Sequence, residues 1–223
     1  MKKKSVCIIS GGMDSAVSAH IAKQEGYEII GLHFNYGQRT QQKEKECFNN
    51  LCDDLGVIKR YDLDLDLLKQ IGASSLTDTS IDIPTQGLEE GVPSTYVPFR
   101  NGIFLSVAAA VAEKHGAAAI HIGVVEEDSS GYPDCTDNFI KALQSAINIG
   151  TKKNTELEIC MPLVSMSKKL IAQKAHTLGV DLTHTWSCYQ NSKRACGVCD
   201  SCRLRLRGFN QAGIKDPIAY EEA

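Results

Sequence analysis

The six residues 10–15, Ser10-Gly11-Gly12-Met13-Asp14-Ser15, and the segments on either side of them decide the fold of this chain. Residues 5–9 are apolar and predict a short buried strand. Residues 16–22 predict a helix that begins at Asp14 or Ser15. A strand that passes through a glycine-rich turn into a helix N-terminus is how α/β proteins bind phosphate. The glycines let the backbone approach the anion, and the free amides and the helix dipole face it.

The type of loop narrows the nucleotide chemistry. The string lacks the Gly-Lys-Ser/Thr ending of a Walker A loop, and it lacks the three spaced glycines of a dinucleotide-binding turn. It resembles instead the pyrophosphate loop, SGGxDS, of the N-type ATP pyrophosphatases. These enzymes cleave ATP between its α- and β-phosphates and adenylate an oxygen of the substrate. The alternative is a strand–helix turn that merely accommodates small residues, which a lone Gly-Gly pair would favour.

Outward from this loop, strand and helix patterns alternate along the chain. Apolar runs predict strands at 28–35, 59–63, 118–124 and 157–162. Helical spacing predicts helices at 41–55, 101–115, 136–149 and 167–178, with a short one near 65–71 inside the irregular stretch 64–95. The helix at 101–115 is nearly all apolar, so it belongs to a core or to an interface. Repeated β-α units predict a doubly wound, mainly parallel sheet of the adenine-nucleotide α-hydrolase-like type, with ligands at the carboxyl ends of the strands.

Nine cysteines are spread unevenly, and four of them fall within fifteen residues near the C-terminus. These are Cys188, Cys196, Cys199 and Cys202, the last three in the spacing C-x2-C-x2-C. Four thiolates in one knuckle predict a closed, tetrahedral structural zinc site. An iron–sulfur cluster is the open alternative, because ferredoxins share this spacing. A disulfide framework is disfavoured, since the cysteine total is odd and no secretion signal is recognisable. We expect an α/β domain over 1–184 and a zinc-binding subdomain over 185–223.

Composition sets the broad class of protein. The chain has 223 residues, 43% of them hydrophobic and 23% charged, with a formal net charge of −3. These values are typical of a soluble globular protein with one main domain. No apolar run is long enough to span a membrane, and no general basic excess indicates a polynucleotide partner. We therefore expect a cytoplasmic protein without a membrane or nucleic-acid partner. Its oligomeric state is open, a homo-oligomer included.

Several further motifs follow the predicted strands in a fixed order. They are residues 36–39 (YGQR), 97–101 (VPFRN), 126–135 (EEDSSGYPDC), and 162–163 (PL) with Lys168, followed by the cysteine knuckle that opens with Cys188-Tyr189. This set resembles the 7-cyano-7-deazaguanine synthases, the nitrile-forming family of the queuosine pathway, over almost the whole chain. Three positions depart from the family pattern: Phe99 replaces a usual glycine, Thr40 a common histidine and Thr136 a frequent arginine. The departures concern substrate contacts and leave the reaction class unchanged.

The resemblance implies a specific reaction. The family converts 7-carboxy-7-deazaguanine, ammonia and two ATP into 7-cyano-7-deazaguanine (preQ(0)) through an adenylated carboxylate and an adenylated amide, with release of AMP and pyrophosphate. The chain would then be a ligase that forms a C–N bond. It implies ATP, Mg²⁺ and one structural Zn²⁺ as cofactors, and a small deazapurine and ammonia as substrates. A glutaminase domain would not fit in this length, so free ammonia or a separate partner supplies the nitrogen.

The resemblance also implies roles for individual residues. The phosphate cradle would consist of Ser10, Gly11, Gly12 and Ser15, with Asp14 holding magnesium or orienting pyrophosphate. Catalysis would depend on Asp14, on Lys168, which reaches the phosphates, and on Arg100. The substrate would contact Arg39, Arg100, Asp128, Tyr132 and Asp134. Each of these residues also has a purely structural alternative. Lys168 could be a solvated helix lysine, Arg39 and Arg100 could be surface arginines, and Tyr132-Pro133-Asp134 could be a simple turn.

Two other function classes compete with this interpretation. A tRNA thiouridine synthetase would use the same adenylating loop, but it would need a basic RNA-binding domain and a reactive cysteine near the phosphate site. A non-catalytic nucleotide-binding module would explain the fold, but it would explain neither the motif at 130–135 nor the cysteine knuckle.

Overall fold

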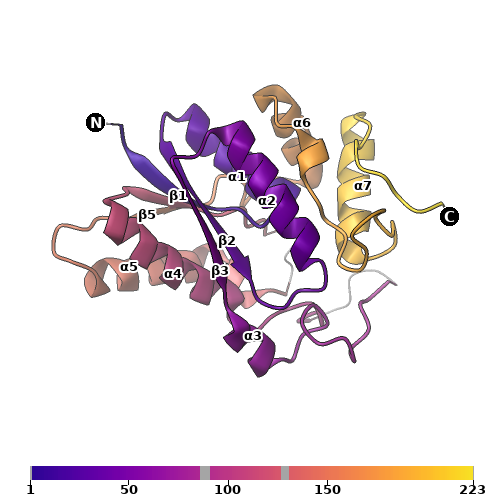
Figure 1. The fold of residues 1–223 in the computed structure, drawn as a ribbon, viewed down its shortest axis with the longest axis horizontal. Coiled ribbons are helices and arrows are strands. Elements are labelled where there is room, and N and C mark those ends of the chain that lie inside the picture. Colours follow the sequence, from indigo (N-terminus) through magenta and orange to yellow (C-terminus); the bar gives the residue numbers. More distant parts are fainter. Residues whose placement is uncertain (1, 86–90, 127–130, 223) are drawn as a thin grey trace.

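Five parallel strands form the centre of the computed structural model, which describes residues 2–85, 91–126 and 131–222 (Figure 1). Their order in the sheet is β3-β2-β1-β4-β5. The chain therefore adds strands on one side of β1 first, and then on the other. In the central register, Val6 pairs with Ile30 on one side and Ile120 on the other. The strands are β1 (Lys4–Ile8), β2 (Glu28–Asn35), β3 (Lys59–Asp64), β4 (Ala119–His121) and β5 (Glu158–Cys160).

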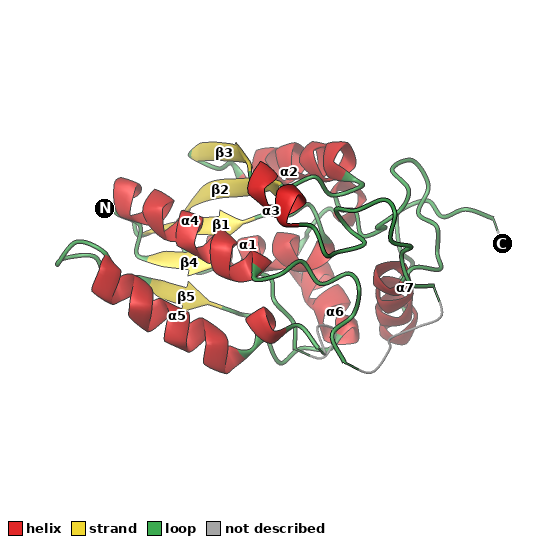
Figure 2. Ribbon diagram, turned by 90° about the horizontal axis from the view of Figure 1, so that it is seen from below, coloured by secondary structure: helices red, strands yellow, loops and turns green. Residues whose placement is uncertain are grey.

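Helices cover both faces of this sheet (Figure 2). One face is covered by α4 (Arg100–His115) and α5 (Asp137–Gly150), and the other by α1 (Met13–Gln24), α2 (Gln41–Leu55) and α6 (Lys168–Leu178). The last helix, α7 (Asp200–Ala212), packs beside α6. Shorter elements are α3 (Asp66–Ile71) and two 3₁₀ turns at Pro133–Cys135 and Leu182–His184. The predicted doubly wound α/β fold is therefore confirmed.

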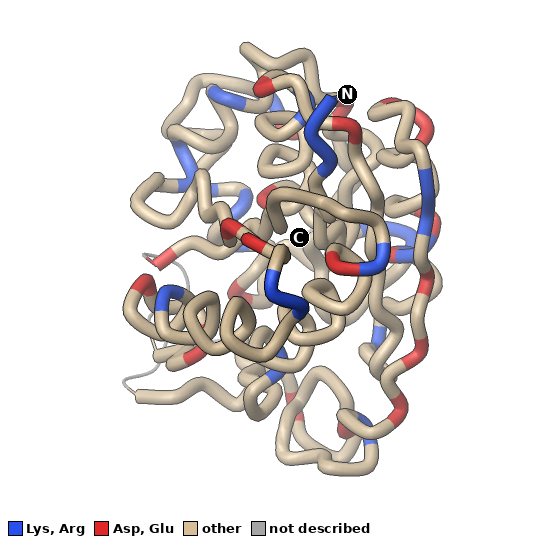
Figure 3. Tube along the Cα trace, turned by 90° about the vertical axis from the view of Figure 1, so that its left-hand side faces the viewer, with Lys and Arg blue, Asp and Glu red and all other residues tan. Residues whose placement is uncertain are grey.

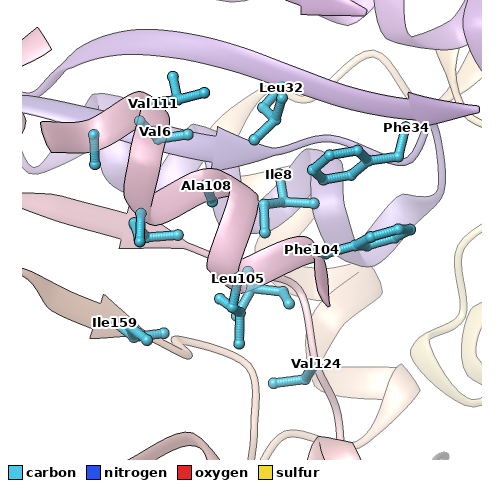
Figure 4. Close-up of a cluster of buried hydrophobic side chains, with 14 of the residues drawn as sticks. Val6, Ile8, Leu32, Phe34, Phe104, Leu105, Ala108, Val111, Val124 and Ile159 are labelled. Atoms are coloured by element: carbon cyan, nitrogen blue, oxygen red, sulfur yellow. The ribbon is translucent and has the colours of Figure 1, made fainter. Parts of the chain in front are cut away.

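The core explains why the first strand is a continuous apolar run. Val6 and Ile8 point toward α4, whereas Cys7 and Ile9 belong to the core on the α1 side. A strand buried on both faces needs apolar residues at every position. Figure 4 shows Val6 and Ile8 packed among residues of β2 and α4, where the rings of Phe34 and Phe104 stack with centroids 4.2 Å apart. This packing fixes the strand end from which the glycine-rich loop departs.

Most of the predicted elements agree with the observed bounds to within one residue. Helix α2 ends as expected at Gly56, whose φ of 60° is the left-handed conformation of a helix C-cap. Helix α1 begins at Met13, one residue earlier than predicted, and β4 is shorter than the apolar run at 118–124. The apolar helix α4 supplies Leu105, Ala108 and Ala112 to the core. The sequence analysis did not predict helix α7.

The C-terminal segment, residues 185–222, packs directly against the α/β part of the chain. The Trp186 amide donates to the Gly11 carbonyl over 2.8 Å. Gly208 of α7 packs so closely on α6 that a Cβ there would lie 2.5 Å from Cβ of Lys168. Inside the segment, Arg205 is buried and makes a two-bond ion pair with Asp216 at 2.7 and 2.9 Å. Among the described residues, no helix combines the length and the apolar character that crossing a bilayer requires.

Candidate active site

A cavity opens at the carboxyl ends of β1 and β4, where the strand order of the sheet reverses. In doubly wound folds this switch point is the general position of ligand sites. The cavity is lined by residues of the loops after β1, β2 and β4, of helices α4 and α6, and of the C-terminal segment. The predicted site residues on its wall are Ser10, Gly12, Asp14, Ser15, Arg39, Arg100, Tyr132, Lys168 and Cys188.

The glycine-rich loop has the geometry of an anion site. Gly11 has a φ of +89°, and a Cβ at this position would lie 2.6 Å from the backbone oxygen of Glu44. The Ser15 hydroxyl accepts from the Ser10 amide at 3.1 Å and donates to the Gly12 carbonyl at 2.9 Å, which closes the loop. No side chain caps the start of α1 at Gly12. The first amides of the helix therefore face the cavity and can bind an anion.

Gly123, which sequence reasoning did not single out, supports the loop from β4. A Cβ at Gly123 would lie 2.7 Å from the carbonyl carbon of Asp14 and 2.7 Å from the amide nitrogen of Ser15. Any larger side chain would displace the start of α1. The only signal in the sequence is a glycine inside a predicted strand, which indicates close approach of another backbone.

Asp14 and Lys168 form an ion pair on the wall of the cavity. Lys168 Nζ lies 2.6 Å from Asp14 Oδ2, and the two side chains are 10% and 27% exposed. The second carboxylate oxygen, Oδ1, is buried without a hydrogen-bond partner among the described residues. Burial of a charged oxygen without a donor costs free energy, which a bound cation or donor would offset. Residues 154 positions apart thus meet at the phosphate loop.

Arg100 places a half-buried positive charge at the other end of the cavity. Its Nη1 donates to the Tyr36 hydroxyl at 3.1 Å, and its guanidinium lies 5.6 Å from the centroid of the Tyr36 ring. Burial raises the pKa of Tyr36 to about 12, so its hydroxyl is neutral. The Tyr36 hydroxyl therefore does not neutralise the charge of Arg100. Nε of Arg100 is buried and unpartnered, and no described carboxylate forms an ion pair with the guanidinium. Such a cation calls for an anionic ligand.

Arg39 reaches the same cavity, but its hydrogen bonds have another purpose. Its Nε donates to the Ser75 carbonyl at 2.8 Å, and its Nη2 donates to the carbonyls of Asp78 and Ile81 at 3.0 and 2.5 Å. The guanidinium therefore fixes the segment 75–81 beside the cavity. Arg39 also lines the cavity, so its contact with the substrate stays a prediction.

The three residues expected at the base differ in their placement. Tyr132 lines the cavity, and its hydroxyl lies 2.6 Å from the Thr95 hydroxyl. Asp134 is buried away from the cavity wall, where its carboxylate accepts from the Asn101 amide at 2.8 Å in the first turn of α4. Burial raises the pKa of Asp134. Asp128 lies outside the described residues.

The four cysteines of the knuckle converge as predicted. The Sγ atoms of Cys188, Cys196, Cys199 and Cys202 all lie within 4.8 Å of one another. A tetrahedral ion with bonds of about 2.3 Å places its sulfur ligands about 3.8 Å apart, so the group can hold one. Backbone amides at 190, 191 and 196 donate to Cys188 Sγ over 3.3–3.4 Å, which favours a thiolate. A tetrahedral ion held by these four cysteines would have no open ligand position.

Trp186 connects the knuckle to the phosphate loop. Its amide is bonded to Gly11, and its indole Nε1 donates to the Asn191 carbonyl at 2.9 Å, inside the knuckle. The ring is 5% exposed and lies on the cavity wall. The sequence analysis assigned no individual role to four further residues on this wall, Tyr36, Glu44, Tyr189 and Arg205. Their positions depend on contacts between distant segments.

Comparison with known proteins identifies the family of the chain. The profile of the family described as queuosine biosynthesis protein QueC matches residues 4–213. The protein named 7-cyano-7-deazaguanine synthase of Sulfurovum sp. (strain NBC37-1) is 68% identical over 222 residues, with all of both chains covered. The protein of the same name from Aliarcobacter butzleri (strain RM4018) is 61% identical, over 99% of this chain and 96% of that one.

Solved structures of low identity show the fold alone. NMN synthetase from Francisella tularensis aligns with a TM-score of 0.53 at 15% identity, over 96% of this chain and 79% of that one. A 4-thiouridine synthetase, solved with RNA and ATP, aligns with a TM-score of 0.53 at 19% identity, over 95% of this chain and 50% of that one. With the full-length relatives and the family profile in agreement, the chain belongs to the family of the queuosine biosynthesis protein QueC.

Proposed function

We propose that this chain synthesises 7-cyano-7-deazaguanine from 7-carboxy-7-deazaguanine, ammonia and two ATP, as a ligase that forms a C–N bond. The names of its relatives support the product. The observation that carries the proposal is one cavity with the glycine-rich loop at one end and, at the other, the half-buried Arg100, which has no ion-pair partner among the described residues. A carboxylate on the base would supply the anion that Arg100 lacks. Its oxygens would then face ATP on the loop.

The chemistry explains why both ends are needed. A carboxylate is a poor electrophile, so one oxygen must first become a leaving group, and adenylation achieves this. Ammonia then forms an amide, and a second adenylation of the amide oxygen lets AMP leave as the nitrile forms. Lys168 and the free amides of α1 would stabilise the pyrophosphate that departs at each adenylation. Arg100 would hold the carboxylate in line with the α-phosphate.

Two metal ions are part of the proposal. Asp14, with its unpartnered Oδ1, would hold Mg²⁺, which neutralises the triphosphate charge when bound. The four knuckle cysteines would hold one Zn²⁺ with no open position, so this ion would have a structural role. Because ATP and reduced thiols are cytoplasmic, we propose the cytoplasm as the location and small molecules as the partners.

The stoichiometry of the reaction tests this proposal directly. The protein is incubated with ATP, Mg²⁺, ammonium and 7-carboxy-7-deazaguanine, and the base is followed by mass spectrometry. Two adenylations require two AMP and two pyrophosphates for each nitrile formed, without ADP. Formation of ADP as the main product would contradict both the family reaction and the role of the loop.

Tyr132 provides a test of base recognition. Replacing Tyr132 with Ala should weaken binding of the deazaguanine by about 1 kcal/mol through loss of ring contact, and ATP affinity should stay unchanged. Isothermal titration with each ligand measures both affinities. The matched control is Tyr132→Phe, which keeps the ring and removes only the hydroxyl that contacts Thr95. A variant that loses ATP affinity instead would place the base elsewhere.

A further inference from the structure

Two carboxylates line the cavity among the described residues, and only one of them is neutralised. Asp14 is paired with Lys168. Glu44, in the first turn of α2, has no described cation as an ion-pair partner. Among the described residues, this cavity-lining carboxylate is therefore without a neutralising cation. The proposed reaction brings in one small cation besides magnesium, since ammonia is mostly ammonium at neutral pH.

The Glu44 carboxylate is held in a fixed orientation by neutral groups. Its Oε1 accepts from the Thr40 hydroxyl at 2.7 Å, and its Oε2 accepts from Gln38 Nε2 at 3.0 Å. Gln38 is itself oriented, because its Oε1 accepts from the Tyr36 amide at 2.8 Å. Thr40 and Gln38 are 2% and 5% exposed. Two buried neutral donors position the carboxylate without forming an ion pair with it.

The same contacts place Glu44 between the two ends of the cavity. On one side, its backbone oxygen lies against Gly11 of the phosphate loop. On the other side, Gln38 connects it to Tyr36, whose hydroxyl is bonded to Arg100. An acyl group adenylated between the loop and Arg100 would therefore form beside this carboxylate.

We propose that Glu44 binds the ammonium ion and removes a proton from it, an inference that rests on the proposed function. Ammonium transfers one proton to the Glu44 carboxylate, and the nitrogen lone pair of the resulting ammonia attacks the acyl carbon of the adenylate. The bond from that carbon to the AMP oxygen then breaks, and AMP takes the second proton of the nitrogen as the amide forms. Glu44 returns to its charged form by releasing its proton to water. Atoms and charges balance without any other reactant.

The test separates adenylation from attack by ammonia. In Glu44→Gln, exchange of labelled pyrophosphate into ATP, with 7-carboxy-7-deazaguanine and Mg²⁺ but no ammonium, should stay within about twofold of wild type, because this half-reaction does not use the base. Amide and nitrile formation should fall about 10²-fold at neutral pH, the usual contribution of a general base. Raising the pH or the ammonium chloride concentration should restore the rate, since free ammonia needs no base. The exchange also reports that the variant is folded, and Glu44→Ala repeats the test without an amide at this position.

Glu46→Gln is the matched control. Glu46 lies on the same helix but is exposed, and it pairs with Lys43 at 2.9 Å. The rate of nitrile formation by the Glu46→Gln variant should depend on ammonium concentration as that of wild type does. The inference is overturned if the Glu44 variants match this control, or if they lose pyrophosphate exchange and recover it with added Mg²⁺, which would make Glu44 a nucleotide-site residue. Absence of nitrile with the wild-type protein would instead reject the proposed function itself.

Discussion

Replacing Asp14 with Asn is expected to lower kcat about 10²-fold or more, with little change in the KM of the deazaguanine. The side chain keeps its size but loses the charge that faces Lys168 at 2.6 Å and the buried Oδ1 that lacks a described partner. That charge should hold magnesium and align the pyrophosphate as it leaves, so its effect grows in the transition state. Steady-state AMP formation with ATP and base varied separately measures kcat and both KM values.

Asp137→Asn is the matched control for this variant. Asp137 also lies in the first turn of a helix and pairs with a lysine, Lys141, at 2.6 Å, but on the exposed face of α5 and away from the cavity. It should leave kcat unchanged. An Asp14→Asn enzyme with normal kcat and a raised KM for the base would show that Asp14 contacts the base and not the phosphates.

The fold could be predicted where local pattern and packing agree. Strand β1 is buried on both faces and is apolar throughout, and α2 ends at a glycine that has the required positive φ. Helix α7 could not be predicted in this way. It begins at Asp200, inside the cysteine knuckle, and its largest fully buried side chain is Arg205, at 1% exposure. In a sequence an arginine indicates a surface. Its burial is stabilised by the ion pair with Asp216 and by hydrogen bonds to Thr185, Ser187 and the Leu182 carbonyl, which the sequence does not reveal.

For the candidate site, too, local pattern predicted some features and distant contacts determined others. The carboxyl ends of parallel strands meet at one edge, so motifs that follow strands were expected together, and Arg100 and Lys168 do share a cavity with the phosphate loop. The hydrogen-bond partners of each side chain could not be predicted from the sequence. The sequence did not reveal, for example, that Arg39, which is predicted to bind an anion, donates to three carbonyls of the neighbouring loop. Basic and acidic residues are interspersed along the trace in Figure 3, so charge alone does not single out Arg100.

The closeness of the knuckle and the phosphate loop has an energetic consequence. Trp186 is bonded to both, and the knuckle residue Cys188 lies on the cavity wall. Disorder in the knuckle would therefore free the Gly11 carbonyl from its partner and loosen the turn that presents the helix amides. A structural metal in this position would stabilise the nucleotide site without contacting the nucleotide.

Replacing Cys199 with Ser is accordingly expected to bring bound zinc well below one per chain and to loosen the chain from about residue 186 onward. Structural zinc contributes on the order of 10 kcal/mol, and this energy is local folding energy. Cys199 is fully buried and precedes the first residue of α7, so the helix start should loosen with it. Metal analysis measures the zinc, and the emission of Trp186, the only tryptophan of the chain, should shift to the red as its ring is exposed.

ATP affinity provides an independent measure of the same variant. Because the Trp186 amide is bonded to Gly11, Cys199→Ser should bind ATP more weakly, although Cys199 is not on the cavity wall. Cys160→Ser is the control, since Cys160 is half-buried in β5 and outside the four-cysteine group, and it should keep both the zinc and the ATP affinity. Full zinc content in Cys199→Ser, or iron with a charge-transfer colour in the wild type, would refute the zinc assignment. Normal ATP affinity in a zinc-free variant would show instead that the loop keeps its shape without the knuckle.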